Sequence, residues 1–201
     1  MAIETRGLRK HLEEITDHYG DDRVSEQIPR IAELNARFPH SISLLQAAIP
    51  GKPETFQFNC YQHSFGLARA ESVTRIMREY WHVFPGREFV QFLLDRSLQD
   101  IPTDEVRDGD HVIYAGAEIE HAGIVRERRI ESKWGLGHLW RHGVYEVPLR
   151  YGNRVRFFRQ LAPETCVRAF LNTGQNEERA PFDCAATASS KISVFRSGEN
   201  A

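Results

Sequence analysis

The hydrophobic pattern of this chain changes once, at Asp108-Gly109-Asp110. Before this point, apolar residues recur at the three- and four-residue spacing of helices. After it, β-branched and aromatic residues gather in short runs that are bounded by glycine and polar turns. Helices followed by a series of antiparallel strands are typical of an α+β fold. We therefore expect an α+β domain in which helices pack on an antiparallel sheet.

Four segments of the first half have a helical pattern, and they span residues 3–19, 24–38, 60–80 and 89–98. The first two are amphipathic and richly charged, which is typical of helices that pack one face on a core or on a partner. We interpret residues 1–45 as a helical N-terminal extension. A further hypothesis is that these helices form a docking or immunity-protein surface.

Four strands are predicted in the second half, and they span residues 111–115, 119–125, 129–134 and 153–161. A short polar turn at Glu127-Arg128 joins the second strand to the third. The pattern weakens after Ala162, and residues 173–178 and 185–190 have the composition of loops or disordered segments. We therefore predict a central domain at 46–161 and a partly irregular C-terminal tail at 162–201.

Composition places the chain among soluble globular proteins, with 41% hydrophobic and 27% charged residues. The net charge of −2 provides no basic surface for nucleic acid or for an anionic membrane. Three cysteines without a C-x-x-C pair indicate free thiols in a reducing compartment rather than a disulfide framework. We see no signal peptide or membrane-spanning run, and we expect a cytoplasmic protein as synthesised, exported only by a dedicated secretion system.

Cys60 is the candidate nucleophile. Asn59 precedes it, and asparagine is a good helix N-cap because its side chain accepts a hydrogen bond from a free N–H of the first turn. A thiolate at a helix start is stabilised by the helix dipole and by unpaired N–H groups. Such a thiol can begin nucleophilic catalysis if a histidine reaches it. The alternative is that Cys60 is a small buried hydrophobic residue.

Three short motifs carry a resemblance to a known family. They are Asn59-Cys60, Gly109-Asp110-His111-Val112-Ile113 and His121-Ala122-Gly123-Ile124-Val125. In this order they resemble the NlpC-type and CHAP-type papain-like cysteine peptidases, over about residues 54–160. The resemblance implies that 46–161 is a papain-like catalytic domain, in which a helix-start cysteine packs on the sheet that carries the histidine.

The resemblance also implies an activity. The protein would be a cysteine hydrolase that cleaves an amide bond in peptidoglycan stem peptides or cross-links, as a bacterial effector or a phage lysin does. Cys60 would form the acyl-enzyme, and His121 would act as base and acid. No metal or organic cofactor is expected. The expected partners are the peptide substrate and a secretion-machine or immunity protein, with no nucleic acid and no membrane.

The resemblance implies that the third catalytic residue comes from the strand after the histidine strand, where Glu131, Ser132 and Lys133 are the candidates. The turn between the two strands limits the choice. A two-residue turn at 127–128 pairs Gly123 with Ser132 and places Ser132 on the face of His121. A three-residue turn shifts the register by one and places Glu131 there instead. We favour Glu131, because a carboxylate both orients and stabilises an imidazolium.

Aromatic and histidine residues near these motifs are candidates for binding the substrate. Tyr61 and Gln57 are possible second donors to an oxyanion hole formed with the N–H of Cys60. Further substrate-binding candidates beside Cys60 are Trp134, His138 and Trp140. His138 and His142 also have a spacing that could bind zinc, but the glutamate of an H-E-x-x-H motif is missing and the nearby glycines favour a loop.

Two other classes of function remain open. A non-catalytic papain-like binding module would present the surface around residues 134–142 to a partner, with Cys60 merely buried. A thiol-dependent deamidase or acyltransferase would use the same acyl-enzyme on a protein substrate. The ionisation of Cys60 separates these hypotheses, because catalysis requires an accessible thiol of low pKa and binding does not.

Overall fold

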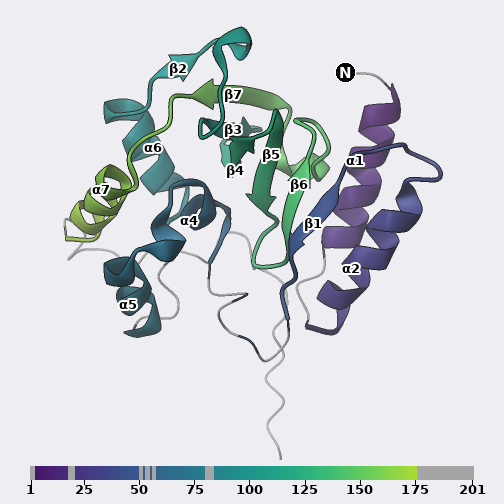
Figure 1. The fold of residues 1–201 in the computed structure, drawn as a ribbon, viewed down its shortest axis with the longest axis horizontal. Helices are drawn as coiled ribbons and strands as arrows, with labels where there is room; N and C mark the ends of the chain where they lie inside the picture. Colours follow the sequence, from purple (N-terminus) through teal and green to yellow (C-terminus); the bar gives the residue numbers. More distant parts are fainter. Residues whose placement is uncertain are drawn as a thin grey trace, which may run out of the picture.

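A seven-stranded antiparallel sheet forms the centre of the part of the chain that the computed structural model describes, which is residues 3–17, 21–49, 52, 55, 58–79 and 84–175 (Figure 1). The strands lie in the order β1-β6-β5-β4-β3-β7-β2. Their bounds are Ser43–Gln46 (β1), Asp100–Ile101 (β2), His111–Ala115 (β3), Ile119–Arg126 (β4), Arg129–Lys133 (β5), Leu139–His142 (β6) and Arg154–Phe158 (β7).

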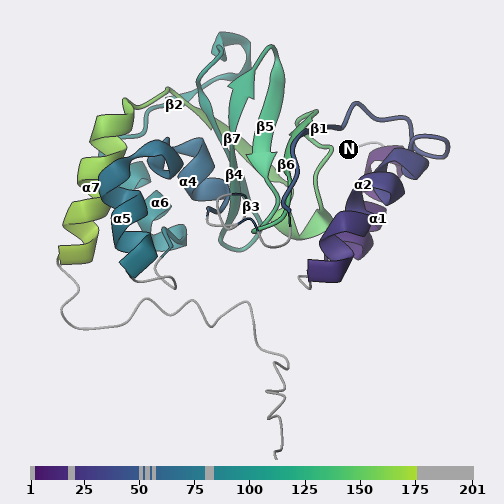
Figure 2. The ribbon, with the colours of Figure 1, turned by 60° about the horizontal axis from the view of Figure 1, so that its bottom comes forward.

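Helices cover both faces of this sheet, so the fold is α+β as predicted (Figure 2). On one face lie α1 (Ile3–Thr16) and α2 (Asp21–Leu34). On the other lie α4 (Cys60–Ser64), α5 (Glu71–Glu79), α6 (Arg87–Arg96) and α7 (Pro163–Gln175). Short 3-10 turns are η1 (Leu67–Arg69), η2 (Thr103–Glu105) and η3 (Leu149–Tyr151). None of the described helices is long and apolar enough to cross a membrane.

Strand alternation divides the interior into two cores. Successive side chains of a strand point to opposite faces. Val112 and Tyr114 therefore pack with Leu12 of α1 in the first core. Ile113 and Ala122 lie on the other face and pack in the second core, whose members from the helices include Cys60, Phe65, Phe89 and Phe170. The buried residues of β3 and β4 are thus divided between the side of α1–α2 and the side of α4–α7.

A buried arginine ties α1 to the rest of the domain. Arg9 is fully buried, and its guanidinium donates to the carbonyls of Val147 (3.1 Å) and Pro148 (3.3 Å) and to Oδ1 of Asn153 (2.7 Å). Buried carbonyls need such donors, because an unpaired one loses its hydration without compensation. The α1 and α2 helices also supply leucine and isoleucine side chains to the first core. The predicted extension therefore shares its core with the sheet.

Several elements differ from the prediction. The helix that begins at Cys60 ends at Ser64 rather than at 80, because Gly66 adopts a left-handed conformation (φ 71°) that a helix cannot continue through. The segment after Ala162 forms α7, which begins with proline at its first position. The strands β1, β2 and β6 were not predicted, because each has only two to four residues. Cys184 and the predicted irregular segment 185–190 lie outside the described residues.

We expect Arg9→Met to lower the free energy of unfolding by about 3 kcal/mol, because the buried carbonyls that Arg9 serves lose their donors. Urea unfolding followed by circular dichroism measures this change. Lys10→Met is the matched control, because Lys10 is the exposed neighbour on the same helix. Equal stability of the two variants would mean that the Arg9 contacts do not hold α1 to the domain.

Candidate functional site

The start of α4 has the geometry that the sequence predicted. The Asn59 side chain accepts a hydrogen bond from the N–H of Gln62 (3.0 Å), and the Gln62 side chain accepts one from the N–H of Asn59 (2.8 Å). This reciprocal pair is a capping box, which satisfies two free donors of the helix start. Cys60 is therefore the first residue of a capped helix.

The thiol of Cys60 is buried, however. Cys60 lies in the second core, which also holds Ala122 of β4. Burial raises the pKa of the Cys60 thiol to about 12, and the hydrogen bond from the N–H of Ala122 offsets only part of this effect. Because α4 has only five residues, the favourable effect of the helix start is small. The thiol is thus protonated at neutral pH in this conformation.

His121 lies on the opposite face of the sheet from Cys60. It is opposite Tyr114 in the β3–β4 ladder, and its ring stacks on Tyr151 with centroids 3.8 Å apart, both residues of the first core. Its neighbour Ala122 points toward Cys60. The ring is fully buried, which lowers its pKa well below the ordinary value, and neither ring nitrogen bonds to another described residue. The structure therefore does not form the predicted Cys60–His121 pair.

The turn after β4 decides the place of the third predicted residue. It has two residues, Glu127 and Arg128, with φ of 51° and 62°. The ladder accordingly pairs Ile124 with Glu131, which places Ser132 on the face of His121 and Glu131 on the face of α4. The choice of Glu131 to orient His121 was wrong, and the register expected for a two-residue turn is the one observed.

Both candidates for the third residue have other partners. Ser132 Oγ lies 2.8 Å from Nε2 of His142 and accepts a hydrogen bond from the indole of Trp134 (3.2 Å). Glu131 accepts two hydrogen bonds from Arg141, at 2.7 and 3.2 Å. Ser132 therefore belongs to a buried polar network of the first core, and Glu131 to a partly exposed ion pair.

The predicted substrate-binding residues are packed in the interior. Trp134 and Trp140 belong to the first core. His138 accepts a hydrogen bond from the N–H of Ala48 (2.9 Å) and donates to the carbonyl of Val24 (2.7 Å), so both its nitrogens are used. Tyr61 is buried as well, and its hydroxyl donates to the carbonyl of a β4 residue. All four are thus buried rather than exposed to a substrate, and Gln57 lies outside the described residues.

The Gly-Asp motif before β3 has a structural role. Asp110 is buried and accepts hydrogen bonds from the N–H of Gln160 (3.0 Å) and the guanidinium of Arg159 (3.0 Å). Gly109 has a φ of 97°, and a Cβ at this position would collide with the Gln160 side chain. The motif therefore ties the start of β3 to the segment after β7.

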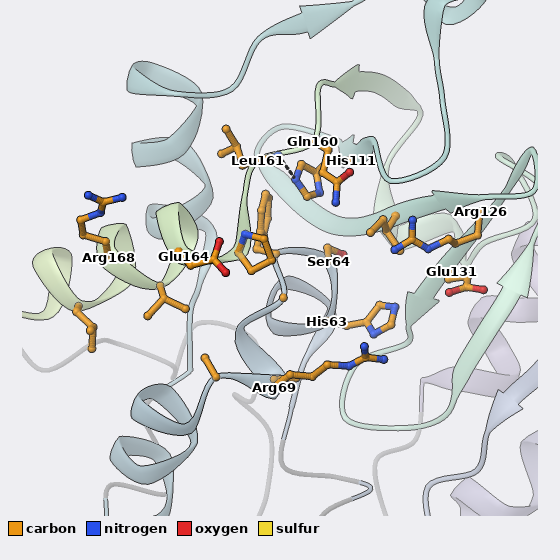
Figure 3. A pocket seen from close by; sticks show the side chains of 18 of the residues that line it. His63, Ser64, Arg69, His111, Arg126, Glu131, Gln160, Leu161, Glu164 and Arg168 are labelled. Atoms are coloured by element: carbon orange, nitrogen blue, oxygen red, sulfur yellow. Dashed lines mark hydrogen bonds between the residues drawn. The ribbon is translucent and has the colours of Figure 1, made fainter.

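A cavity of about 740 Å³ is bounded by α4 and η1, by the strands β4 and β5, and by α7 (Figure 3). We call it the α4–α7 cavity. Its wall includes apolar side chains of Phe65, Ile124 and Val167. Its charged and polar lining residues include His63, Arg69, Arg126, Glu131, Glu164 and Arg168. Cys60 and His121 are not among the lining residues. The cavity is thus separate from the predicted catalytic pair.

The arginine side chains of this cavity are unpaired within the part of the chain that the structure describes. Among the described residues, the side chains of Arg69, Arg126 and Arg168 make no hydrogen bond or ion pair. Glu131, in contrast, pairs with Arg141 (2.7 Å), which also contacts Glu127 (2.8 Å). Positive charge therefore exceeds negative charge along the lining.

His63 lies beside two of these arginines. Figure 3 draws its imidazole between the side chains of Arg69 and Arg126. Burial, followed by the charges of Lys133, Arg69 and Arg126, lowers the pKa of His63 to about 4. Its Nε2 atom is buried without a partner among the described residues. At neutral pH the imidazole is therefore uncharged and can still donate or accept a hydrogen bond.

Comparisons with protein-family models, with curated proteins and with solved structures found no match to this chain. The function is consequently argued from the site itself. The sequence pattern predicts no site role for His63 and does not identify the cavity. Arg69, Arg126 and Arg168 stand far apart in the chain and form no motif.

We expect Cys60 to react with iodoacetamide at least about 100-fold more slowly in the native protein than in urea at neutral pH, because its thiol is buried and protonated. Peptide mass spectrometry measures the rate, and Cys166 is the matched control, since it is also buried and its pKa is raised to about 11. Fast alkylation of Cys60 alone near pH 7, lost in His121→Gln, would show that the protein also adopts a conformation in which the two residues meet.

Proposed function

We propose that this protein is a binding module that takes an organic anion in the α4–α7 cavity. The observation that carries this proposal is the pair of arginines, Arg69 and Arg126, that flank His63 in the cavity without a described anionic partner. Guanidinium groups bind carboxylate, phosphate and sulfonate oxygens through paired N–H donors. Arg126 is partly buried without a described partner, and a bound anion would offset the cost of burying its charge, whereas Arg69 is exposed at the rim.

The other lining residues suit the rest of such a ligand. Apolar side chains such as Phe65, Ile124 and Val167 offer a surface for a carbon skeleton. The volume of about 740 Å³ lies within the range of pockets that hold small molecules. Figure 3 places Arg168 on α7, across the cavity from Arg126. We therefore infer a ligand with an apolar body and an anionic group near His63.

The proposal is tested with a pair of fluorescent probes, 8-anilinonaphthalene-1-sulfonate and its uncharged analogue N-phenyl-1-naphthylamine. We expect the sulfonate to bind more tightly than the neutral probe. Arg126→Gln should weaken sulfonate binding by about tenfold, because a hydrogen bond to a charged group is lost, and should leave the neutral probe unaffected. Fluorescence titration measures both affinities.

Arg107→Gln is the matched control, because Arg107 is an exposed arginine outside the cavity. It should bind both probes as the wild type does. The proposal fails if neither probe binds, or if the sulfonate binds the Arg126 and Arg107 variants equally well.

The anion should also bind more tightly in mild acid. A bound anion stabilises the imidazolium of His63 and so raises its pKa above the free value of about 4. At a pH between the pKa of His63 in the free protein and its pKa in the complex, binding of the anion is coupled to binding of a proton, and the affinity therefore rises as the pH falls. At a pH above the pKa of His63 in the complex, the affinity does not depend on His63.

We expect the sulfonate affinity of the wild type to increase between pH 7 and pH 5, in isothermal titration calorimetry at constant ionic strength. His63→Gln keeps a polar side chain and should abolish this increase while leaving the affinity at pH 7 nearly unchanged. An identical pH dependence in both proteins would assign the protonation to another group.

A second candidate is the cysteine hydrolase that the papain-like resemblance implies, with a peptidoglycan peptide as substrate. It is favoured by the capping box that starts α4 at Cys60, and by the buried ring of His121, whose nitrogens have no hydrogen-bond partner among the described residues. A one-residue slip of β4 would move His121 to the face of Cys60. The ladder already shifts register between Tyr114 and Ala115.

The turn after β4 offers a physical reason for such a slip. Glu127 and Arg128 both have positive φ, which costs about 1 kcal/mol or more for each residue other than glycine. A longer turn would relieve this strain while shifting the register by one. Rapid, His121-dependent alkylation of Cys60 is the result that would favour this candidate over the binding module.

A further inference from the structure

Exposed apolar side chains gather at one edge of the sheet. Among the described residues, the large hydrophobic side chains that are more than a third exposed are Leu44 (38%), Leu45 (41%), Ile49 (40%), Leu136 (41%) and Tyr145 (43%). Two of them belong to β1, Ile49 follows it, and Leu136 lies in the β5–β6 loop. The N–H of Ala48 donates to His138 of that loop (2.9 Å), which joins these segments. We call Leu44, Leu45, Ile49 and Leu136 the β1 surface.

The strand β1 ends the sheet on this side. It pairs with β6 along one edge, and all four of its residues are exposed. Its register shifts between Leu44 and Gln46, so that Leu45 is the extra residue of a bulge. A bulge interrupts the alternation of side chains, which accounts for the exposure of both leucines. The outer edge of β1 therefore presents main-chain groups beside two apolar side chains.

This edge lacks charged side chains and proline. Lysine and other charged residues, and also proline, keep many edge strands from pairing. Residues 41–49 contain no aspartate, glutamate, lysine, arginine or proline. The opposite edge differs, because Asp100 of β2 forms an ion pair with Arg156 (2.5 Å). An apolar patch on an uncharged edge is an interaction surface rather than ordinary protein surface.

The absence of charged side chains on the β1 surface favours a second copy of this chain as its partner. In an antiparallel β1–β1 pair, the residues near the two-fold axis face their own copies, so a charge there would meet the same charge. The β1 surface carries none and can meet itself without repulsion. A strongly charged partner, in contrast, would find no complementary group along 41–49.

We propose that the β1 surface is the interface of a two-fold homodimer, in which β1 lies antiparallel to β1 of a second copy of this chain. Leu44 and Leu45 of the two copies bury one another, with Ile49 and Leu136 at the margins. The α4–α7 cavity involves other elements, so the dimer is independent of the proposed anion site.

The test is the molar mass of the full chain in sedimentation velocity and light scattering over a wide range of concentration. We expect the wild type to change from monomer to dimer as its concentration rises. Leu45→Lys should raise the dimer dissociation constant about tenfold or more, because it removes an apolar contact and places two like charges at the interface. Its circular dichroism spectrum and melting temperature should stay close to those of the wild type, since Leu45 is exposed.

Thr103→Lys is the matched control, because it adds the same charge to an exposed residue of η2, which follows β2 at the other edge of the sheet. It should dimerise as the wild type does. A wild type that stays monomeric at every concentration overturns the proposal. A dimer that Leu45→Lys and Thr103→Lys weaken equally, or not at all, overturns it as well, because its interface then lies elsewhere.

Discussion

The register of β4 against β5 is the constraint on which both faces of this sheet depend. A two-residue turn at Glu127-Arg128 sets it, and strand alternation carries its effect along the sheet. Glu131 consequently points toward α4 and the cavity, whereas His121 and Ser132 point toward α1. A shift of β5 by one residue would instead place Glu131 on the face of His121 and Ser132 on the face of α4. The chemistry available on either face is therefore decided by the length of a single turn.

The two faces differ in how they treat ionisable groups. On the α1 face, His121 and His142 are buried, and burial lowers the pKa of both rings, so they contribute as neutral, polar parts of the core. On the α4 face, arginines surround a cavity, and burial together with the charges of Lys133, Arg69 and Arg126 lowers the pKa of His63. Unpaired arginines thus line the α4–α7 cavity, where a ligand can reach them, whereas the histidines of the α1 face stay neutral in the core. This separation favours a binding role for the α4–α7 cavity over nucleophilic chemistry at Cys60.

The longer elements could be predicted from local patterns, and the short ones could not. The strands β3, β4 and β5 were predicted to within one residue, because each is rich in residues that suit a half-buried strand. The β1 strand has four exposed residues and therefore shows no alternation between a buried and an exposed face. The end of α4 depends on one glycine, Gly66, whose left-handed conformation is no more favoured by the local pattern than a helical one.

The sequence by itself determined the α+β class, the capped helix start at Cys60 and the two registers that β4 and β5 could adopt. These features depend on residues that are near one another in the chain. Only the tertiary structure decided which register is formed, which face each histidine occupies, and that Arg69, Arg126 and His63 share a cavity. Such groupings arise when distant segments pack together, and a local pattern contains no information on that packing.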